Sequence, residues 1–159
     1  MEGLRIRVAV PRDIRRMSEL EEACFEESYP MELLAFFVMD SRFISLVAEV
    51  DQVIVGMAVA ELEDKELKKV GHIWTVEVLP PYRRKGIAMK LLTELEERLR
   101  ARGATECYLE VRTDNEPAIR LYEKLGYEKV GIIRDYYCPG VDAFFMVKDL
   151  TKMSPGDLG

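Results

Sequence analysis

The stretch VEVLPPYRRKGIAMKLL, residues 76–92, decides the fold. It begins with β-branched and apolar residues, as a buried strand does, and Pro80-Pro81 ends that strand. Gly86 then opens a helix whose apolar residues recur on one side. The first amide groups of a helix have no partner inside it and lie at the positive end of its dipole. With the cations Arg83, Arg84 and Lys85 beside them, these amides predict a binding site for phosphate groups.

Small residues in this loop support the same interpretation. Gly86 lets a ligand approach the backbone, and Ala88 keeps the surface beside it low. The loop differs from the phosphate-binding motifs GxxxxGK[ST] and GxGxxG. A plain helix start with basic residues in its loop is the alternative.

Hydrophobic periodicity places further elements around this segment. Strands are expected at 4–10, 43–50, 53–62, 70–79, 106–112, 127–137 and 142–150. Helices are expected at 11–27, 31–39, 86–103 and 115–125, with a charged loop at 63–69. The order β-α-α-β-β-β-α-β-α-β-β contains one strand–helix–strand crossover, which makes its two strands parallel. We therefore expect an α/β domain over residues 1–150, one sheet with helices on both faces, and a flexible tail at 151–159.

Composition limits the possible functions. The 159 residues carry 29 acidic and 23 basic side chains, and a net charge of −6 argues against a nucleic-acid partner. Neither a signal peptide nor an apolar run of the about 20 residues that a membrane span needs is found. Three widely spaced cysteines and one histidine predict reduced thiols, no metal site and a cytoplasmic protein.

Two motifs resemble the GNAT superfamily of N-acetyltransferases. The RxxGxG/A signature of that family matches Arg83, Gly86 and Ala88, after the strand HIWTVEV. The block LEVRTDNEPAIRLYEKLGYEKVG at 109–131 matches a second family segment. This block, the segment DYYCPGVDAFFM, the segment Glu27-Ser28-Tyr29-Pro30 and His72 are similar to RimI-type and archaeal protein N-terminal acetyltransferases.

The resemblance implies a GNAT fold, a mixed, mostly antiparallel sheet whose central parallel strands splay apart. The pantetheine arm of acetyl-CoA then fills the gap, and its pyrophosphate lies on the amides of residues 84–89. Asn115 is expected to bond the pantetheine, to cap a helix, or to do both. The cofactor contacts implied are Val76, Glu77, Val78, Arg83, Arg84, Lys85, Gly86, Ile87, Ala88, Met89, Asn115 and Tyr122.

The resemblance also implies catalytic roles. Tyr122 resembles the general acid that protonates the leaving thiolate, and a phenol is protonated at neutral pH without tuning. The N–H of Val78 is the implied oxyanion donor. Glu110 resembles the general base, with Glu27 and His72 as rival or cooperating bases. The structural alternatives are a packed tyrosine, a solvated strand glutamate and a structural histidine.

The acceptor is the least determined part. Tyr136 and Tyr137 resemble a pair that holds a peptide backbone, and Tyr29 is expected to lie opposite, although adjacent strand residues normally face opposite ways. An α-amine has a pKa of about 7.7–8.0 against about 10.4 for lysine, so a glutamate base suits it better. We therefore expect protein or peptide N-termini, ribosomal proteins among them, and a monomer or weak homodimer. The alternatives are a protein lysine, a polyamine, an acyl-CoA sensor without catalysis, and a phosphate- or RNA-binding module.

Overall fold

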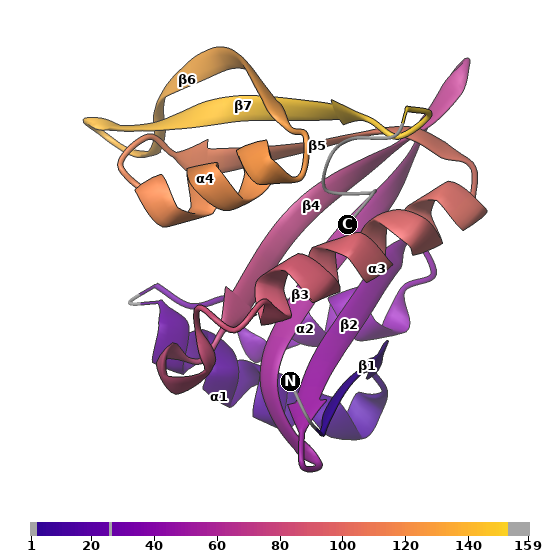
Figure 1. Ribbon diagram of the computed structural model, residues 1–159, viewed down its shortest axis with the longest axis vertical. Coiled ribbons are helices and arrows are strands. Elements are labelled where there is room, and N and C mark those ends of the chain that lie inside the picture. The colour runs from indigo at the N-terminus through magenta and orange to yellow at the C-terminus, as the bar shows by residue number, and fades with distance from the viewer. Residues whose placement is uncertain (1–2, 26, 153–159) are drawn as a thin grey trace.

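The computed structural model describes residues 3–25 and 27–152 (Figure 1). In these residues one seven-stranded sheet has the order β1-β2-β3-β4-β5-β7-β6, and only the β4–β5 pair is parallel. The strands are β1 Leu4–Val8, β2 Phe43–Val50, β3 Val53–Lys65, β4 Lys68–Val78, β5 Ala104–Arg112, β6 Glu128–Cys138 and β7 Val141–Asp149. The mixed, mostly antiparallel sheet is the one that the sequence predicts. The part of the tail from residue 153 lies outside the described residues.

Helices cover both faces of the sheet, as expected. They are α1 Ile14–Cys24, α2 Met31–Met39, α3 Ile87–Ala101 and α4 Glu116–Lys124, with 3₁₀ turns η1 at Pro11–Asp13 and η2 at Pro80–Tyr82. One apolar core joins α3 and α4 to the sheet, and a second joins α1 and α2 to the opposite face (Figure 1). None of the described helices has the length and apolar character that crossing a membrane requires.

Two predicted boundaries are wrong. The charged loop expected at 63–69 is instead the end of a long hairpin, in which Asp64 pairs with Lys69 and only residues 66–67 form the turn. The backbone pairing of β3 with β4 continues as far as Lys65 and Lys68, which a prediction of a loop from charge alone overlooks. The first helix ends at Cys24 rather than near Glu27, because Phe25 is already extended (φ −135°).

The parallel strands β4 and β5 pair over only a short length. Their register runs from Lys69–Ala104 to His72–Tyr108 and then stops. In the β3–β4 ladder, Thr75 and Ile73 face consecutive β3 residues, so Trp74 is the extra residue of a bulge. A bulge bends its strand, and β4 diverges from β5 beyond this point (Figure 1). The predicted splay is confirmed.

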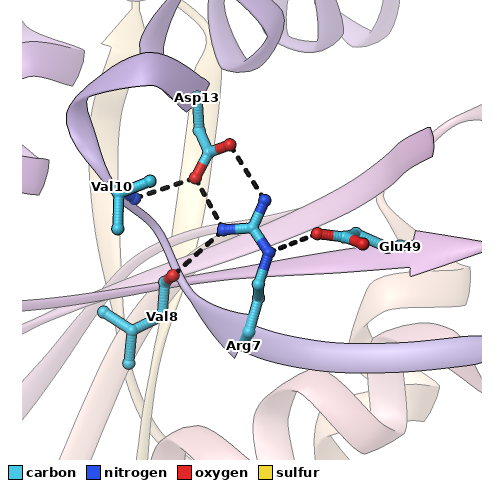
Figure 2. Close-up of polar contacts among 5 residues, drawn as sticks. All are labelled: Arg7, Val8, Val10, Asp13 and Glu49. Carbon is cyan, nitrogen blue, oxygen red and sulfur yellow. Dashed lines mark hydrogen bonds and ion pairs between the residues drawn. The ribbon is translucent and has the colours of Figure 1, made fainter. Parts of the chain in front are cut away.

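A partly buried ion-pair network attaches the start of α1 to the sheet edge. The Arg7 guanidinium of β1 binds both carboxylate oxygens of Asp13, at 2.7 and 2.9 Å, and also the carboxylate of Glu49 on β2 (Figure 2). Asp13 in turn accepts from the N–H of Val10 at 2.8 Å, which fixes the turn that leads into α1 (Figure 2). The network therefore sets where α1 begins relative to β1 and β2.

Candidate active site

The gap between β4 and β5 exposes main-chain groups of β4. The N–H of Leu79 bonds the carbonyl of Val55 on β3 at 2.8 Å. Because main-chain groups alternate along a strand, those of Val76 and Val78 point into the gap instead. The Val78 carbonyl accepts from Arg83 Nε at 2.8 Å. The Val78 N–H is then the donor of this residue that is directed into the gap. An edge of this kind can bind an extended polar chain.

The loop from β4 to α3 has the geometry of an anion cradle. Arg84 (φ +64°) and Gly86 (φ +82°) both lie in the left-handed region, which turns successive N–H groups toward one side. A Cβ built on Gly86 meets no atom within 4 Å, so the space over the start of α3 is open. Arg83, Arg84 and Lys85 are all exposed beside it. Phosphate oxygens fit this combination of free amides, open space and cations.

The predicted cofactor contacts at the start of α3 have main-chain groups that face the cradle and side chains that are buried or partly buried. Ile87 is 1% exposed, so its side chain belongs to the core and only its N–H faces the cradle. Ala88 and Met89 are partly buried against the same core. The side chain of Glu77 also points away from the gap, into a buried contact with α1. The main chain, rather than these side chains, is therefore the part suited to bind a cofactor here.

Helix α4 supplies two predicted residues to the same face. Asn115 caps the helix, its Oδ1 accepting from the Ala118 N–H at 3.3 Å, so the capping interpretation is correct and a cofactor contact stays a prediction. Tyr122 is 9% exposed and packs edge-to-face against Tyr127, with 5.8 Å between ring centroids. Burial first, and the nearby Tyr137 second, raise the pKa of Tyr122. Its hydroxyl is therefore protonated throughout the physiological pH range.

His72 and Glu110 meet at the point where the parallel strands separate. His72 Nε2 lies 2.7 Å from Glu110 Oε1, and both side chains are 13% exposed. The His72 ring stacks on Tyr108, with 4.5 Å between centroids and planes only 7° apart. Leu109 and Val111 face the core on the α3–α4 side, so Glu110 points to the opposite face, as the strand pattern predicts.

Glu27 is the third candidate base. It is exposed in the segment between α1 and α2. Within residues 3–25 and 27–152, no hydrogen bond or ion pair joins it to His72 or Glu110. A role for Glu27 in proton transfer stays a prediction.

Sequence reasoning missed the residues that surround His72. Trp74 Nε1 donates to Glu61 Oε1 at 3.2 Å, and the Tyr108 hydroxyl donates to Glu63 Oε1 at 2.7 Å. Ligand atoms of Glu61, Glu63 and His72 lie within 4.8 Å of one another, a spacing that a metal ion can use, but each residue already has a protein partner. The sequence did hold a signal for them. His72 and Trp74 are two residues apart in one strand, as are Tyr108 and Glu110 in another, so the members of each pair lie on the same face of the sheet.

The two adjacent tyrosines of β6 lie together because the strand is irregular. Pairing with β7 jumps from Ile133–Ala143 to Cys138–Val141, so residues 134–137 bulge out of the ladder. The Tyr136 and Tyr137 rings are 4.8 Å apart and nearly perpendicular. In a regular strand they would face opposite ways.

Asp135 fixes this bulge. It has φ +53°, its N–H donates to Asp142 Oδ1 at 2.9 Å, and its Oδ1 accepts from the Gly140 N–H at 2.7 Å. Glu110 lies close enough to Tyr136 to raise its pKa, after the larger effect of burial. The bulge therefore holds the tyrosine pair beside the base candidate.

Tyr29 faces the same space from the other side. Its hydroxyl donates to the Trp74 carbonyl at 3.4 Å, and its N–H donates to Glu21 Oε1 at 3.2 Å. Burial, followed by the charges of nearby groups that include Tyr136 and Tyr137, raises the pKa of Tyr29. The tyrosines from the α1–α2 segment and from β6 thus border one region at the β4–β5 gap.

A loop suited to phosphates, an open strand edge, a buried phenol and a His–Glu pair thus lie around the gap between β4 and β5. The chain belongs to the Acetyltransferase (GNAT) family, whose sequence pattern matches residues 14–127. It is an acetyl-CoA-dependent N-acetyltransferase.

Individual relatives agree with this assignment. The chain is similar to an N-alpha-acetyltransferase of Sulfurisphaera tokodaii, 35% identical over 155 residues that span 92% of this chain and 93% of the relative. Its fold is similar to that of the ribosomal-protein-S18-alanine N-acetyltransferase of Escherichia coli, with TM-score 0.85, 23% identity and coverage of 95% and 96%. It is similar also to Arabidopsis thaliana NAA60 in complex with acetyl-CoA, with TM-score 0.84, 22% identity and coverage of 92% and 99%.

Proposed function

We propose that this protein acetylates the N-terminal α-amine of proteins or peptides, which attacks acetyl-CoA directly in a ternary complex. The observation that carries this proposal is the placement of Tyr29 opposite Tyr136 and Tyr137, at the gap where His72 meets Glu110. An extended chain end that lay between these tyrosines would bring its N-terminal nitrogen to the gap first. The relative named N-alpha-acetyltransferase supports the same acceptor, and ribosomal proteins are among the substrates we propose.

Residues on the α3–α4 side of the sheet would hold acetyl-CoA. The amides of residues 84–89 and the cations of the loop suit its phosphates, and the main chain at Val76 and Val78 suits its pantetheine arm. Acetyl-CoA supplies the acetyl group as a thioester, whose carbonyl carbon the amine attacks. Asn115 can contribute the amide N–H₂ that its capping bond leaves free.

The remaining chemistry consists of two proton movements and one oxyanion contact. Glu110 accepts the proton that the amine loses, and His72 passes that proton on; the 2.7 Å contact between the two side chains supports this transfer. The Val78 N–H donates to the carbonyl oxygen as it becomes negative. Tyr122 donates its phenol proton to the sulfur that leaves, and is reprotonated from solvent.

One observation favours a second acceptor. Glu61, Glu63 and Glu110 surround His72 with carboxylates, which would attract a cationic amine such as a polyamine or a lysine side chain. Against it, the pKa of a lysine amine is about 2.5 units higher than that of an α-amine. Deprotonating lysine before it attacks therefore costs about 3.4 kcal/mol more.

The acceptor can be tested with three peptides of matched sequence. One has a free N-terminus and no lysine, one has a blocked N-terminus and an internal lysine, and one has both amines free. We expect acetylation of the α-amine in the first and third, with a rate that rises through the titration of that amine near pH about 8. Mass spectrometry of the products locates the acetyl group. Modification of the third peptide chiefly on lysine would refute the α-amine proposal and leave the acetyltransferase assignment intact.

A further inference from the structure

Two buried glutamates lie between α1 and β4, and the chemistry above does not use them. Glu21 on α1 is 2% exposed and Glu77 on β4 is 4% exposed. Glu21 Oε1 accepts from the Tyr29 N–H at 3.2 Å, and Glu77 Oε2 accepts from the Thr75 hydroxyl at 2.9 Å. The second oxygen of each, Glu21 Oε2 and Glu77 Oε1, has no hydrogen-bond donor in the described part of the chain. A buried carboxylate oxygen without a donor is strongly destabilising.

One shared proton removes this difficulty. Glu21 and Glu77 are buried on neighbouring elements, each with one oxygen that lacks a donor, and the Glu21 carboxyl is close enough to influence Glu77. Two ionised carboxylates at that separation repel, whereas a carboxylic acid donates a strong hydrogen bond to a carboxylate. Burial first, and the Glu21 carboxyl second, raise the pKa of Glu77 well above its usual range. A carboxylic acid bonded to a carboxylate would give each of the two groups a partner for both oxygens.

This acid pair connects the acceptor wall to the cofactor strand. Glu21 holds the main chain of Tyr29, and the Tyr29 hydroxyl binds the carbonyl of Trp74 on β4. Glu77 belongs to β4, directly before Val78. The other titratable and charged groups around the pair are Cys24 on α1, Arg83 of the cradle loop, and Tyr29 itself. Tyr29 is thus fixed to β4 at its main chain and at its hydroxyl.

We propose that Glu21 and Glu77 are positioning residues for the acceptor, which act through Tyr29 by sharing one proton between α1 and β4. The proposal rests on the acceptor function given above. Loss of the shared proton leaves two buried negative charges side by side. Their repulsion moves the Tyr29 segment off β4 and away from the acceptor, while the cradle for acetyl-CoA keeps its shape.

Substitutions at Glu21 separate the shared proton from simple packing. In Glu21→Gln, the side-chain oxygen still accepts from the Tyr29 N–H and the new N–H₂ donates to Glu77, so both contacts persist at any pH. Glu21→Ala removes both. Glu22→Gln is the matched control, since Glu22 is the next residue of α1 and is exposed. The measurements are the KM for the N-terminal peptide, the KM for acetyl-CoA and kcat, each from pH 7 to 10.

We expect Glu21→Ala to raise the peptide KM about tenfold, as loss of a hydrogen bond to a charged group does, with the KM for acetyl-CoA nearly unchanged. Glu21→Gln and Glu22→Gln should match the wild type at pH 7. The ratio of the wild-type peptide KM to the Glu21→Gln peptide KM should rise between pH 7 and 10. Titration of the acceptor amine affects both variants equally, so it cancels in this ratio. Equal effects on both KM values, or a Glu21→Gln variant as impaired as Glu21→Ala, would overturn the proposal.

A measurement on the protein alone, without any peptide, makes the test of the acid pair independent of which acceptor the enzyme uses. Trp74 is the one tryptophan of the sequence, and its carbonyl accepts from Tyr29. Its fluorescence should change on alkaline titration of the wild type and less in Glu21→Gln. If wild-type protein fails to acetylate α-amines but shows this difference, the acceptor proposal fails and the acid pair stands. If the two titrations coincide, the acid pair fails.

Discussion

At the scale of single residues, the acid that we propose and the base that we propose lie on different faces of the sheet. Tyr122 lies on the α3–α4 side of the sheet, while Glu110 and His72 lie toward the opposite face. The gap between β4 and β5 is the route between them. In the mechanism that we propose, an amine that enters from the Tyr29 side loses its proton on one face, while the thiolate leaves on the other.

Replacing Tyr122 with Phe tests the acid. The change removes one hydroxyl and keeps the ring that packs on Tyr127, so the fold should persist. We expect kcat to fall about 10²–10⁴-fold, the usual contribution of general acid catalysis, with little change in acetyl-CoA affinity.

Tyr127→Phe is the matched control, because its buried hydroxyl bonds Glu96 at 2.7 Å and not the gap. It should lower the free energy of unfolding by about 1–3 kcal/mol while kcat stays within a few-fold of wild type. Equal kcat values in the Tyr122→Phe variant and the wild type would make Tyr122 a packing residue.

At the scale of elements, the loop into α3 and the bulge in β6 are the irregular backbone segments that border the gap. Both contain residues in the left-handed region, at Arg84 and Gly86 in the loop and at Asp135 in the bulge. Backbone of this kind persists only where surrounding contacts hold it, and it is concentrated at functional sites. The regular helices and strands hold these two irregular segments at the two sides of the gap.

Gly86→Glu tests the anion cradle. It places a bulky anion in the open space over the first amides of α3. Calorimetry should show acetyl-CoA binding weakened by about 10–100-fold, as expected when one or two charge-assisted hydrogen bonds are lost.

Gly140→Glu controls for backbone strain, because Gly140 has nearly the same φ of +83° and equally open surroundings. Both variants suffer the strain of a side chain in the left-handed region, but only the first should lose acetyl-CoA. Unchanged affinity in Gly86→Glu would mean that the phosphates bind elsewhere.

The Arg7 network gives an element-scale prediction about acid stability. The hydrogen bond from Arg7 lowers the pKa of Asp13 below its usual range. The stabilisation is therefore complete above the unfolded-state pKa of about 3.9, and it is lost as the pH falls through the lower folded-state value.

Arg7→Ala leaves the carboxylate of Asp13 buried without its partner, and should cost about 3 kcal/mol at pH 7 in urea unfolding. Its stability should also decline less between pH 5 and 2 than that of the wild type. Arg5→Ala, on the same strand and exposed, should cost less than about 0.5 kcal/mol. A loss in Arg7→Ala no larger than in Arg5→Ala would contradict this account.

At the scale of the whole molecule, the sheet consists of two parts that share a short parallel seam. Four residue pairs, Lys69–Ala104 to His72–Tyr108, join β4 to β5. A ligand chain in the gap would pair with both strands and so link the two parts of the sheet. Binding energy would then appear as added stability of the folded protein.

Hydrogen exchange with and without acetyl-CoA tests this link. The N–H groups of Val76 and Val78 should exchange more slowly in the complex, because the ligand replaces the missing strand. At 100 times Kd, acetyl-CoA should add about 2.7 kcal/mol of stability and raise the melting temperature by roughly 5–10 °C. Slower exchange confined to the β3–β4 hairpin turn at 66–67 would contradict this arrangement.

The sequence alone determined the order of elements, the mixed sheet and the position of the anion cradle. These features depend on local signals, namely the prolines after β4, the glycine before α3 and the periodicity of apolar residues. The ends of elements were predicted less well. Charge at 63–69 indicated a loop, but cross-strand pairing of Asp64 with Lys69 made it a hairpin, and such pairing depends on residues that only the folded sheet brings together.

Tertiary structure alone decided the contacts within the site. The bond between His72 and Glu110 joins residues 38 positions apart, and Glu21 meets Glu77 across a helix and a strand. Tyr136 and Tyr137 share one side only because the β6 bulge departs from the alternation that a sequence pattern assumes. The resemblance to a known family, rather than local propensity, pointed to His72, Glu110 and the tyrosines. Their distances and shared protons depend on how strands register and where they separate, which only the packed sheet fixes.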